Sequence, residues 1–262
     1  MLTYFIVCLT AFVVAGLTLF SGFGLGTLLM PAFALFFPLP VAVAATAVVH
    51  LANNLFKAGL VGRNADWGVV ARFAIPGAIA SVAGALLLNF FAALPPLATY
   101  RLGENEHAVS AIGLVMGIII IAFALLDLLP RFQNLAFERK YLPLGGLLSG
   151  FFGGISGNQG ALRAAFLIKA GLDKQAFIST GVMCAVIIDI ARLLVYGVGF
   201  YASQFKSIPV ELSGLVLAAT LAAFGGSFLG SLMVKKVTLR TIQVLVGALL
   251  VIVGAGMAAG LV

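Results

Sequence analysis

The sequence predicts an all-α polytopic membrane protein. Hydrophobic residues make up 63% of the 262-residue chain and charged residues only 9%, whereas about a quarter of the residues in soluble domains are charged. Long apolar runs recur along the chain, and about 20 apolar residues suffice to cross a bilayer as a helix. We therefore expect a bundle of membrane helices with the lipid bilayer as its solvent.

Eight apolar runs follow one another, and the first and fifth of them differ from the rest. The first run, 2–37, is interrupted by the glycines of "SGFGLG" at 21–26, and the fifth run, 141–170, by "GGISGNQG" at 153–160. The unbroken runs, each expected to span the membrane, lie at about 41–62, 67–92, 108–129, 174–200, 208–233 and 239–261.

The order of these runs repeats after about 130 residues. "SGFGLGTLLMPAF" is followed by "AATAVVHLANNLFKAGLVG", and "GGISGNQGALRAAF" is followed by "FISTGVMCAVIIDIARLLVYG". An internal repeat of this length indicates two related structural units. We place the first repeat at 1–130 and the second at 131–262.

The basic residues favour one topology over another. If all eight runs crossed the membrane, seven bases would lie on one side and six on the other. If each broken run instead forms a re-entrant hairpin, the count becomes eleven against two, a strong positive-inside bias. The majority side, expected to be cytosolic, then holds Lys57, Arg63, Arg72, Arg131, Arg139, Lys140, Lys169, Lys174, Lys235, Lys236 and Arg240, against Arg101 and Lys206.

This count predicts six full spans and two hairpins, with both termini outside the cytosol. Each half then has three crossings, so the two halves must be inverted relative to each other. Inverted repeats with interrupted helices are a recurring plan of transporters, whose substrates bind near the middle of the membrane.

The two broken segments resemble those of a known family. "SGFGLGTLLMP" and "GGISGNQGALRAAFLIK", each opening one half, are similar to motifs of the sulfite exporter TauE/SafE family, also called the toluene sulfonate uptake permeases. The resemblance implies a transporter of sulfite, sulfonates or related organic anions, and we expect it in the bacterial inner (plasma) membrane. The second half departs from the pattern, because it reads Gly-Asn-Gln-Gly and carries Arg163 where we match Pro31 of the first half.

The two breaks carry groups that could bind an anion. Half-helices that begin near Gly26 and near Gln159 would point free N–H groups and positive dipole ends into the membrane, which suits an anion. Arg163 would add a planar, bidentate donor for sulfonate or carboxylate oxygens. Two alternatives remain open: the glycines can serve close helix packing, and Arg163 can extend to the membrane interface.

The span after each hairpin carries further polar side chains. His50 and Asn53 are three residues apart on one helical face, as are Asp189 and Arg192. Charged and titratable groups inside a membrane suggest function, and His50 or Asp189 could carry a coupled proton. The alternatives are a structural Asp189–Arg192 ion pair and a buried histidine that only satisfies its own hydrogen bonds.

These arguments define the predicted site. The expected proton-coupling residues are His50 and Asp189. The expected substrate-binding residues are Ser21, Gly24, Gly26, Thr27, Thr46, His50, Asn53, Ser156, Asn158, Gln159, Arg163, Thr180 and Arg192.

The sequence predicts a secondary transporter, either an exporter or a proton-coupled exchanger, of small organic or sulfur-containing anions. A passive anion channel is the alternative. We expect no enzymatic activity, cofactor or metal, since two histidines and two cysteines are scattered along the chain without ligand spacing. The bases lie in short loops, which disfavours nucleic acid, and a homodimer is left open.

Overall fold

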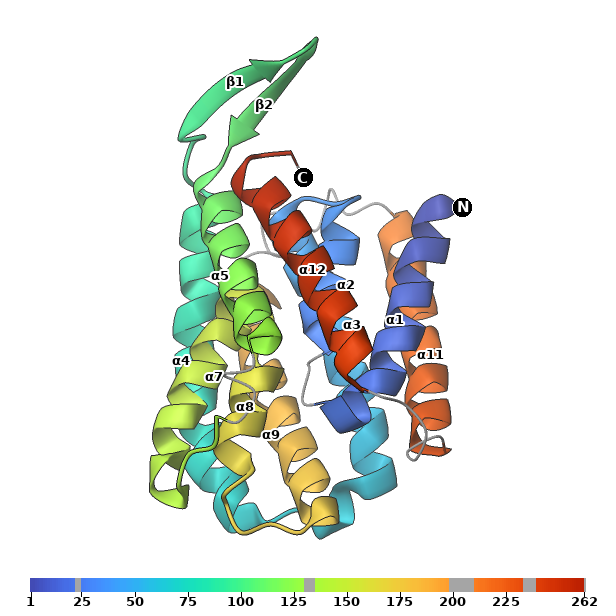
Figure 1. Ribbon diagram of the computed structural model, residues 1–262, viewed down its shortest axis with the longest axis vertical. Coiled ribbons are helices and arrows are strands. Elements are labelled where there is room, and N and C mark those ends of the chain that lie inside the picture. The colour runs from blue at the N-terminus through green and yellow to red at the C-terminus, as the bar shows by residue number, and fades with distance from the viewer. Residues whose placement is uncertain (22–24, 130–134, 198–209, 233–238, 262) are drawn as a thin grey trace.

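The computed structural model describes residues 1–21, 25–129, 135–197, 210–232 and 239–261. It is a helical bundle with one projecting β-hairpin (Figure 1). The first half contains α1 (Leu2–Ser21), α2 (Leu25–Ala34), α3 (Leu39–Val61), α4 (Trp67–Ala92) and α5 (Ala111–Leu128). The second half contains α7 (Leu142–Ser156), α8 (Gly160–Leu167), α9 (Lys174–Val195), α11 (Val210–Leu232) and α12 (Leu239–Ala258).

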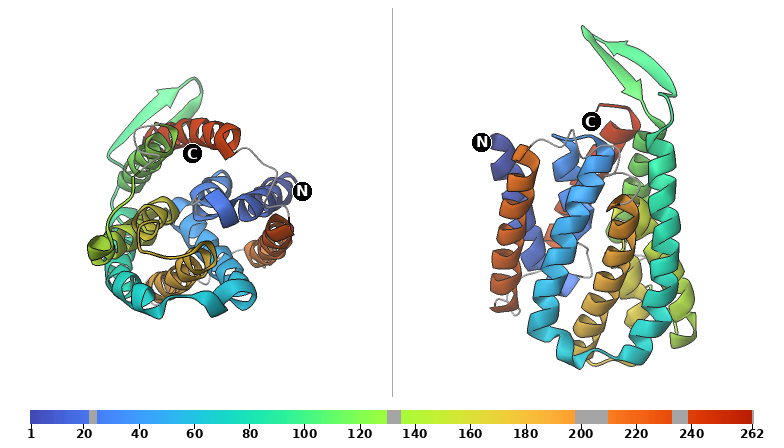
Figure 2. Two further views of the ribbon diagram at one scale, coloured as in Figure 1. Left: turned by 60° about the horizontal axis from the view of Figure 1, so that its bottom comes forward. Right: turned by 180° about the vertical axis from the view of Figure 1, so that it is seen from behind.

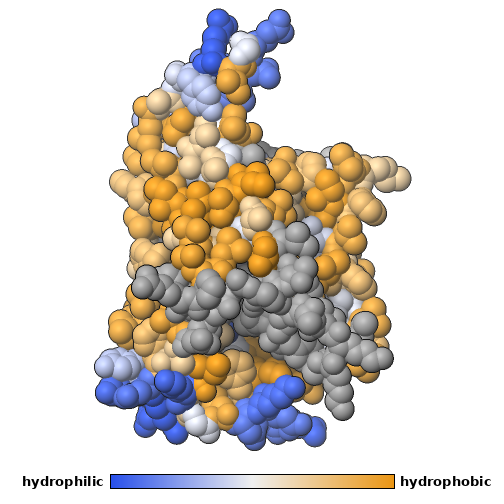
Figure 3. All heavy atoms as spheres, in the orientation of Figure 1, coloured by the Kyte–Doolittle hydropathy of each residue, from blue (hydrophilic) through white to orange (hydrophobic). Residues whose placement is uncertain are grey.

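Among the described residues, four stretches of helix are long and apolar enough to cross a membrane by length and composition. They are Leu39–Asn64, Trp67–Ala92, Lys174–Val195 and Leu212–Leu232. The first includes the short 3-10 helix η1 (Gly62–Asn64), which continues α3. Large apolar side chains on these helices, such as Ile79 and Leu217, are exposed and cover the sides of the molecule (Figure 3). The chain is therefore an all-α integral membrane protein.

The two broken segments turn back on themselves. In Figure 1, α1 descends from the N-terminus and α2 returns upward, whereas α7 rises from the lower end and α8 returns downward. We call the pair α1–α2 hairpin 1 and the pair α7–α8 hairpin 2. The two hairpins therefore enter the bundle from opposite ends.

Helix boundaries recur at a spacing of 135 residues. α2 begins at Leu25 and α8 at Gly160, and α3 begins at Leu39 and α9 at Lys174. The matched central helices α3 and α9 run in opposite directions (Figures 1 and 2). A constant spacing from the hairpins through the central helices lets every residue in this part of one half be matched to one of the other.

Helix packing exchanges partners between the halves. α7 of hairpin 2 packs along α4, and α1 of hairpin 1 packs along α11 (Figure 2). Both contacts are made through glycines, because a Cβ on Gly154 would collide with the Ser81 carbonyl and one on Gly226 with the Phe12 carbonyl. Small residues that let two backbones approach this closely are common at the interfaces between membrane helices.

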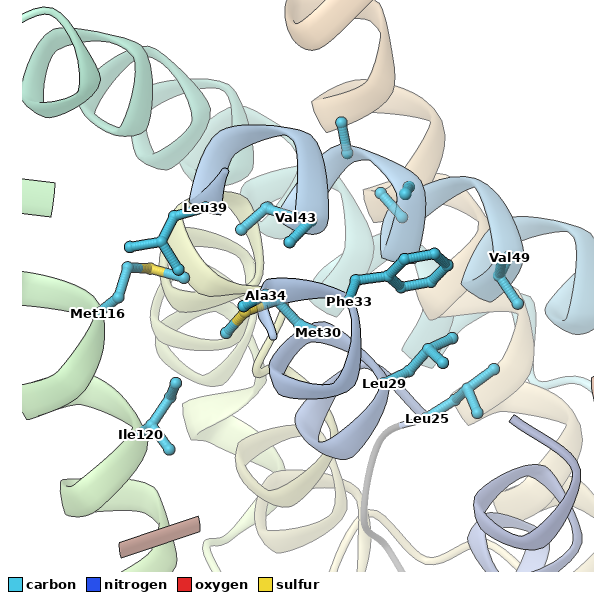
Figure 4. Close-up of a cluster of buried hydrophobic side chains, with 14 of the residues drawn as sticks. Leu25, Leu29, Met30, Phe33, Ala34, Leu39, Val43, Val49, Met116 and Ile120 are labelled. Atoms are coloured by element: carbon cyan, nitrogen blue, oxygen red, sulfur yellow. The ribbon is translucent and has the colours of Figure 1, made fainter. Parts of the chain in front are cut away.

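The returning arm of hairpin 1, α2, is buried in apolar surroundings. Leu29, Met30 and Phe33 of α2 have no exposed surface. Leu29 and Phe33 point to the side of Val49 of α3, and Met30 points to the side of Met116 and Ile120 of α5 (Figure 4). The hydrophobic core of the first half is therefore built around the returning arm of hairpin 1.

A β-hairpin stands at the end of the molecule that also holds Leu2 and Leu261 (Figure 1). It joins β1 (Ala98–Leu102) and β2 (Asn105–Val109) through Gly103, whose φ of 66° suits the first position of a two-residue turn. The strands lie mostly between the expected spans at about 67–92 and 108–129, where no strand was predicted. The alternation in "ATYRLGENEHAV" is the signal that would have indicated two short strands.

Candidate functional site

Asp189 is the centre of a buried polar network between the central helices. Its Oδ2 accepts from His50 Nδ1 at 2.6 Å and from Asn54 Nδ2 at 3.3 Å, both on α3. Its Oδ1 accepts from Gln159 Nε2 at 2.9 Å and Arg192 Nε at 3.0 Å. Because a carboxylate only accepts hydrogen bonds, His50 must donate its Nδ1–H. One carboxylate therefore ties α3, α9 and the tip of hairpin 2 together.

The tip of hairpin 2 is held by α9. Gly157 ends α7 in the left-handed conformation (φ 81°), which glycine adopts without strain. The last carbonyls of α7 need partners once the helix stops. Arg192 Nη1 donates to the Gly153 carbonyl at 2.9 Å, and the Tyr196 hydroxyl donates to the Gly154 carbonyl. These contacts fix where α8 begins.

The breaks of the two hairpins meet at this point. A Cβ on Gly26, the second residue of α2, would lie 2.8 Å from the Gly157 carbonyl oxygen and 3.8 Å from the Thr46 methyl group. A glycine is therefore required at position 26 for the first hairpin to approach the second. Thr27, next to it, is buried.

Several buried polar atoms around the break have no hydrogen-bond partner in the described residues. Asn158 is 3% exposed and neither of its side-chain amide atoms is bonded. Gln159 Oε1, Thr46 Oγ1 and Arg163 Nη1 are also buried and unbonded. Buried polar groups are normally satisfied, so a group of exceptions calls for an explanation such as a ligand or bound water. All of these but Thr46 lie between the end of α7 and the first turn of α8.

The buried charged side chains near the break are mostly basic among the described residues. Arg192 lies 2.7 Å from Asp189 through its Nη2, and the two form a buried ion pair. Lys57 is 5% exposed. Asp189 is the one acidic residue among the buried side chains that the structure describes.

Lys57 was counted among the bases on the cytosolic side, and the predicted site did not include it. It is buried within α3. Positions 50, 53, 54 and 57 follow the i, i+3, i+4, i+7 spacing of one helical face. That spacing would have placed Lys57 with His50, Asn53 and Asn54. Without Lys57 the majority side still holds ten bases against two.

The sequence model of the sulfite exporter TauE/SafE family matches residues 6–257 of this chain. The chain belongs to this family. It is a family of membrane transporters, so the break described above lies in a transporter. Searches of curated proteins and of solved structures gave no significant match.

Most of the residues predicted for this TauE/SafE chain gather at the break. They are Gly26, Thr27, Thr46, His50, Ser156, Asn158, Gln159, Asp189 and Arg192, with Arg163 one turn into α8, beside Gly181 of α9. The Ser156 hydroxyl lies 3.4 Å from the Asn158 backbone nitrogen and donates to the Phe152 carbonyl. The side chain of Ser21 and the whole of Gly24 lie outside the described residues.

Three predicted residues have a different setting. The Thr180 hydroxyl accepts from the Asp66 backbone N–H at 2.9 Å, so it joins α9 to the loop before α4. Asn53 Oδ1 accepts from Ser227 of α11 at 2.8 Å, and only its Nδ2 is unbonded. Arg192 already bonds Asp189 and Gly153, which favours the structural ion pair over a ligand role.

The match between Arg163 and Pro31 also changes. Counted at the spacing of 135 residues that the helix starts define, Arg163 matches Leu28 of α2. The proline is therefore three residues away from the position that carries the charge in the second half.

Proposed function

We propose that the chain is a secondary transporter of small organic or sulfur-containing anions, and that the anion binds at the tip of hairpin 2. The observation that carries this proposal is the group of buried, unbonded polar atoms at the start of α8, next to an arginine. The first N–H groups of a helix have no intrahelical partner and its N-terminus is positively polarised. An anion would accept hydrogen bonds from Asn158 Nδ2 and from the guanidinium of Arg163 together.

The helices around the proposed site would contribute different groups to it. Asn158 and Arg163 would donate to the anion from hairpin 2, and Thr46 would donate from α3. Gly26 would let the backbone of hairpin 1 close over it. His50 and Gln159 would hold the site through Asp189 without being the main ligands.

The transport mechanism that we propose uses two inverted repeats, 1–130 and 131–262. It is supported by the spacing of 135 residues, by the opposite directions of α3 and α9, and by the exchanged packing of α1 on α11 and α7 on α4. In such transporters one repeat rocks against the other around a fixed site. The helix pairs that pack through glycines, α1 with α11 and α7 with α4, would each move as a rigid unit. The site at the hairpin tips would stay fixed.

We propose that His50 couples transport to protons. The ring bridges α3 of one half and Asp189 of the other, so its charge state acts across the boundary between the halves. A protonated ring would strengthen the contact with the carboxylate, and a neutral ring would weaken it. The contact would therefore hold one conformation of the transporter more tightly at low pH.

The orientation is proposed from the basic loops. Five exposed bases lie at or just before the starts of α4, α7 and α9, namely Arg63, Arg139, Lys140, Lys169 and Lys174. These helices begin at the end opposite the β-hairpin (Figure 1), and the positive-inside rule places that end in the cytosol. Cysteines introduced at position 103 and at position 140 would test this in cells. An impermeant thiol reagent added outside should label 103 and spare 140, and the reverse pattern would overturn the orientation.

Transport assays separate a transporter from a channel that uses the same site. The purified protein in liposomes, preloaded with sulfite, should take up labelled sulfite faster than empty liposomes, because a transporter exchanges one substrate for another. Taurine, isethionate and simple carboxylates should be screened in the same way. Flux that is unaffected by internal anion and by a pH gradient would favour the channel and defeat the proposed mechanism.

A further inference from the structure

An apolar cavity lies between hairpin 1 and α12. Its volume is about 340 Å³, and its walls are side chains of α1, α2 and α12, which lie together in Figure 1. Among the described residues that line it, none is charged and only Thr10 of α1 is polar. The cavity is therefore unsuited to an anion, and it shares none of its lining residues with the proposed anion site.

The mouth of the cavity faces the surrounding lipid. Leu9 of α1, Leu35 of α2 and Leu249 of α12 line it, and each is about half exposed on the outer surface of the bundle. The lining residues come from the middle of α1 (6–14) and the middle of α12 (249–253). The cavity therefore lies at the depth of the lipid tails and not at the depth of the headgroups.

The second half fills the matched space with its own side chains. The ends of α1 and α7 lie 135 residues apart, as do the starts of the helices that follow them. At this spacing Thr10 matches Gly145 and Pro31 matches Phe166. Phe166 is 2% exposed, stacks on Phe137 with ring centroids 4.1 Å apart, and packs so closely on α7 that a Cβ on Gly145 would collide with it. In the first half Thr10 and Pro31 line the cavity instead.

An empty cavity of this size would be unfavourable. Its walls would lose the dispersion contacts that a filled interior provides, and even an apolar cavity of about 150 Å³ is large enough to bind benzene. Water is a poor filler, because a buried water needs two to four polar partners and the lining offers one polar side chain. Lipid tails are apolar and flexible, and they surround the mouth.

We propose that this cavity binds one acyl chain of a bilayer phospholipid, which enters from the side of the bundle. The inference goes beyond the transport proposal and does not depend on it. The acyl chain takes the space that Phe166 fills in the second half. It packs on the face of α2 formed by Leu28, Pro31 and Leu35, which follow the i, i+3, i+7 spacing of one helical face. Other residues of α2 pack in the core (Figure 4), so the acyl chain completes the packing of the returning arm.

Photo-crosslinking in nanodiscs tests this site directly. The full chain would be placed in phosphatidylcholine nanodiscs that contain a trace of phosphatidylcholine with a diazirine in the middle of one acyl chain. The labelled residues would be identified by mass spectrometry after illumination. Ala32 is buried and lines the cavity, so label on Ala32 reports an acyl chain inside it. Ile79 of α4 is 67% exposed, so label on Ile79 reports ordinary contact with the surrounding lipid.

The wild-type protein should carry label on both Ala32 and Ile79. Thr10→Gly combined with Pro31→Phe copies the second half and fills the cavity, so label on Ala32 should be lost while label on Ile79 is unchanged. Leu217→Phe enlarges an exposed side chain of α11 away from the cavity. It is the matched control and should leave both labels as they are in the wild type.

The inference would be overturned if the wild-type protein were labelled on Ile79 but not on Ala32, a result that needs no variant. It would also be overturned if label on Ala32 persisted in the folded double variant. If that variant fails to fold, Val13→Trp, which narrows the mouth from an exposed position, replaces it with the same expectations.

Two further results would assign the cavity to another occupant and so contradict the inference. Loss of the Ala32 label on addition of excess oleate would assign it to a free fatty acid. An unlabelled Ala32 in a protein that is dimeric in the nanodisc would assign it to a second copy of the chain.

Discussion

The two hairpins occupy matched places in the bundle but differ in chemistry. Where hairpin 2 has Asn158, Gln159 and Arg163, the sequence of hairpin 1 has Phe23, Gly24 and Leu28. The returning arm α2 is buried among apolar side chains, whereas the start of α8 is surrounded by unbonded polar atoms. We propose that the two halves are repeats of one architecture, and that only the second repeat carries the groups that would hold an anion.

The central helices α3 and α9 also differ in their polar side chains. α3 contributes His50 and Asn53 at positions where α9 has Ala185 and Ile188, and it has Asn54 where α9 has Asp189. Both helices keep a buried cation at the matched positions 57 and 192. The proposed site is therefore asymmetric: hairpin 2 and α3 would supply its open donors, while Arg192 of α9 pairs with Asp189 of the same helix and bonds the tip of hairpin 2.

The largest expected effect comes from removing the carboxylate that joins the halves. Asp189→Asn should lower the free energy of unfolding by about 3–5 kcal/mol, because it leaves Arg192 as an uncompensated buried charge. Denaturant titration in detergent would measure this. Glu138→Gln, which breaks an exposed pair with Lys140, should have almost no effect. An Asp189→Asn variant as stable as wild type would contradict the central position given to Asp189.

Moving the carboxylate to the other half would sharpen the same comparison. In the Asp189→Asn background, Asn54→Asp places an acid three residues before Lys57, as Asp189 precedes Arg192. The double variant should regain part of the lost stability, because the relocated carboxylate would still lie beside His50 and opposite position 189. It should also bind anions less well than wild type. No recovery at all would mean that positions 54 and 189 are not interchangeable.

A smaller loss of stability is expected at the close glycine contacts, which both halves make. Gly154→Ala in α7 and Gly226→Ala in α11 each push a methyl group into a neighbouring carbonyl, and overpacking of this kind costs about 1–3 kcal/mol. Gly59→Ala, with nothing within 4 Å of its Cβ, should be neutral or stabilising by up to about 1 kcal/mol. Thermal unfolding of the three variants compares them. If only one of the two contacts is sensitive, the packing of the two halves is not equivalent.

The effect of His50 should appear in coupling more than in stability. His50→Ala removes the titratable contact between α3 and Asp189. Uptake driven by a pH gradient should then be lost in liposomes, while exchange of anion for anion continues. If both His50→Ala and the folded fraction of Asp189→Asn keep the wild-type pH dependence, neither residue carries the coupled proton.

The sequence was a good guide where the signal is local. Glycines and amides inside an apolar run indicate a broken helix wherever they occur, and the breaks near Gly157 and Gly26 were located in this way. Composition alone was enough for the membrane class. The meeting of Gly26 with Gly157, and the contacts of His50 with Asp189, depend on how helices distant in sequence pack. No pattern within one segment could show them.

The failures have physical reasons as well. Counting bases by side of the membrane says nothing about depth, so Lys57 was counted on the cytosolic side without any sign that it is buried in α3. Thr180 was chosen as a polar group within a span, but its hydroxyl bonds a loop backbone instead. Arg163 was matched to Pro31 from the similarity of the two sequence segments. The helix starts of the structure then gave the register of the two halves.

The most direct test of the account replaces the matched residues of the two hairpins. Arg163→Ala and Leu28→Ala truncate the same position of α8 and α2, and the Kd for the best-binding anion would be measured for both by calorimetry. The account predicts that Arg163→Ala weakens binding about ten- to hundredfold, that Arg163→Lys recovers part of it, and that Leu28→Ala leaves it unchanged. Normal anion binding by folded Arg163→Ala, or equal losses in both alanine variants, would contradict the claim that hairpin 2, and not hairpin 1, holds the anion.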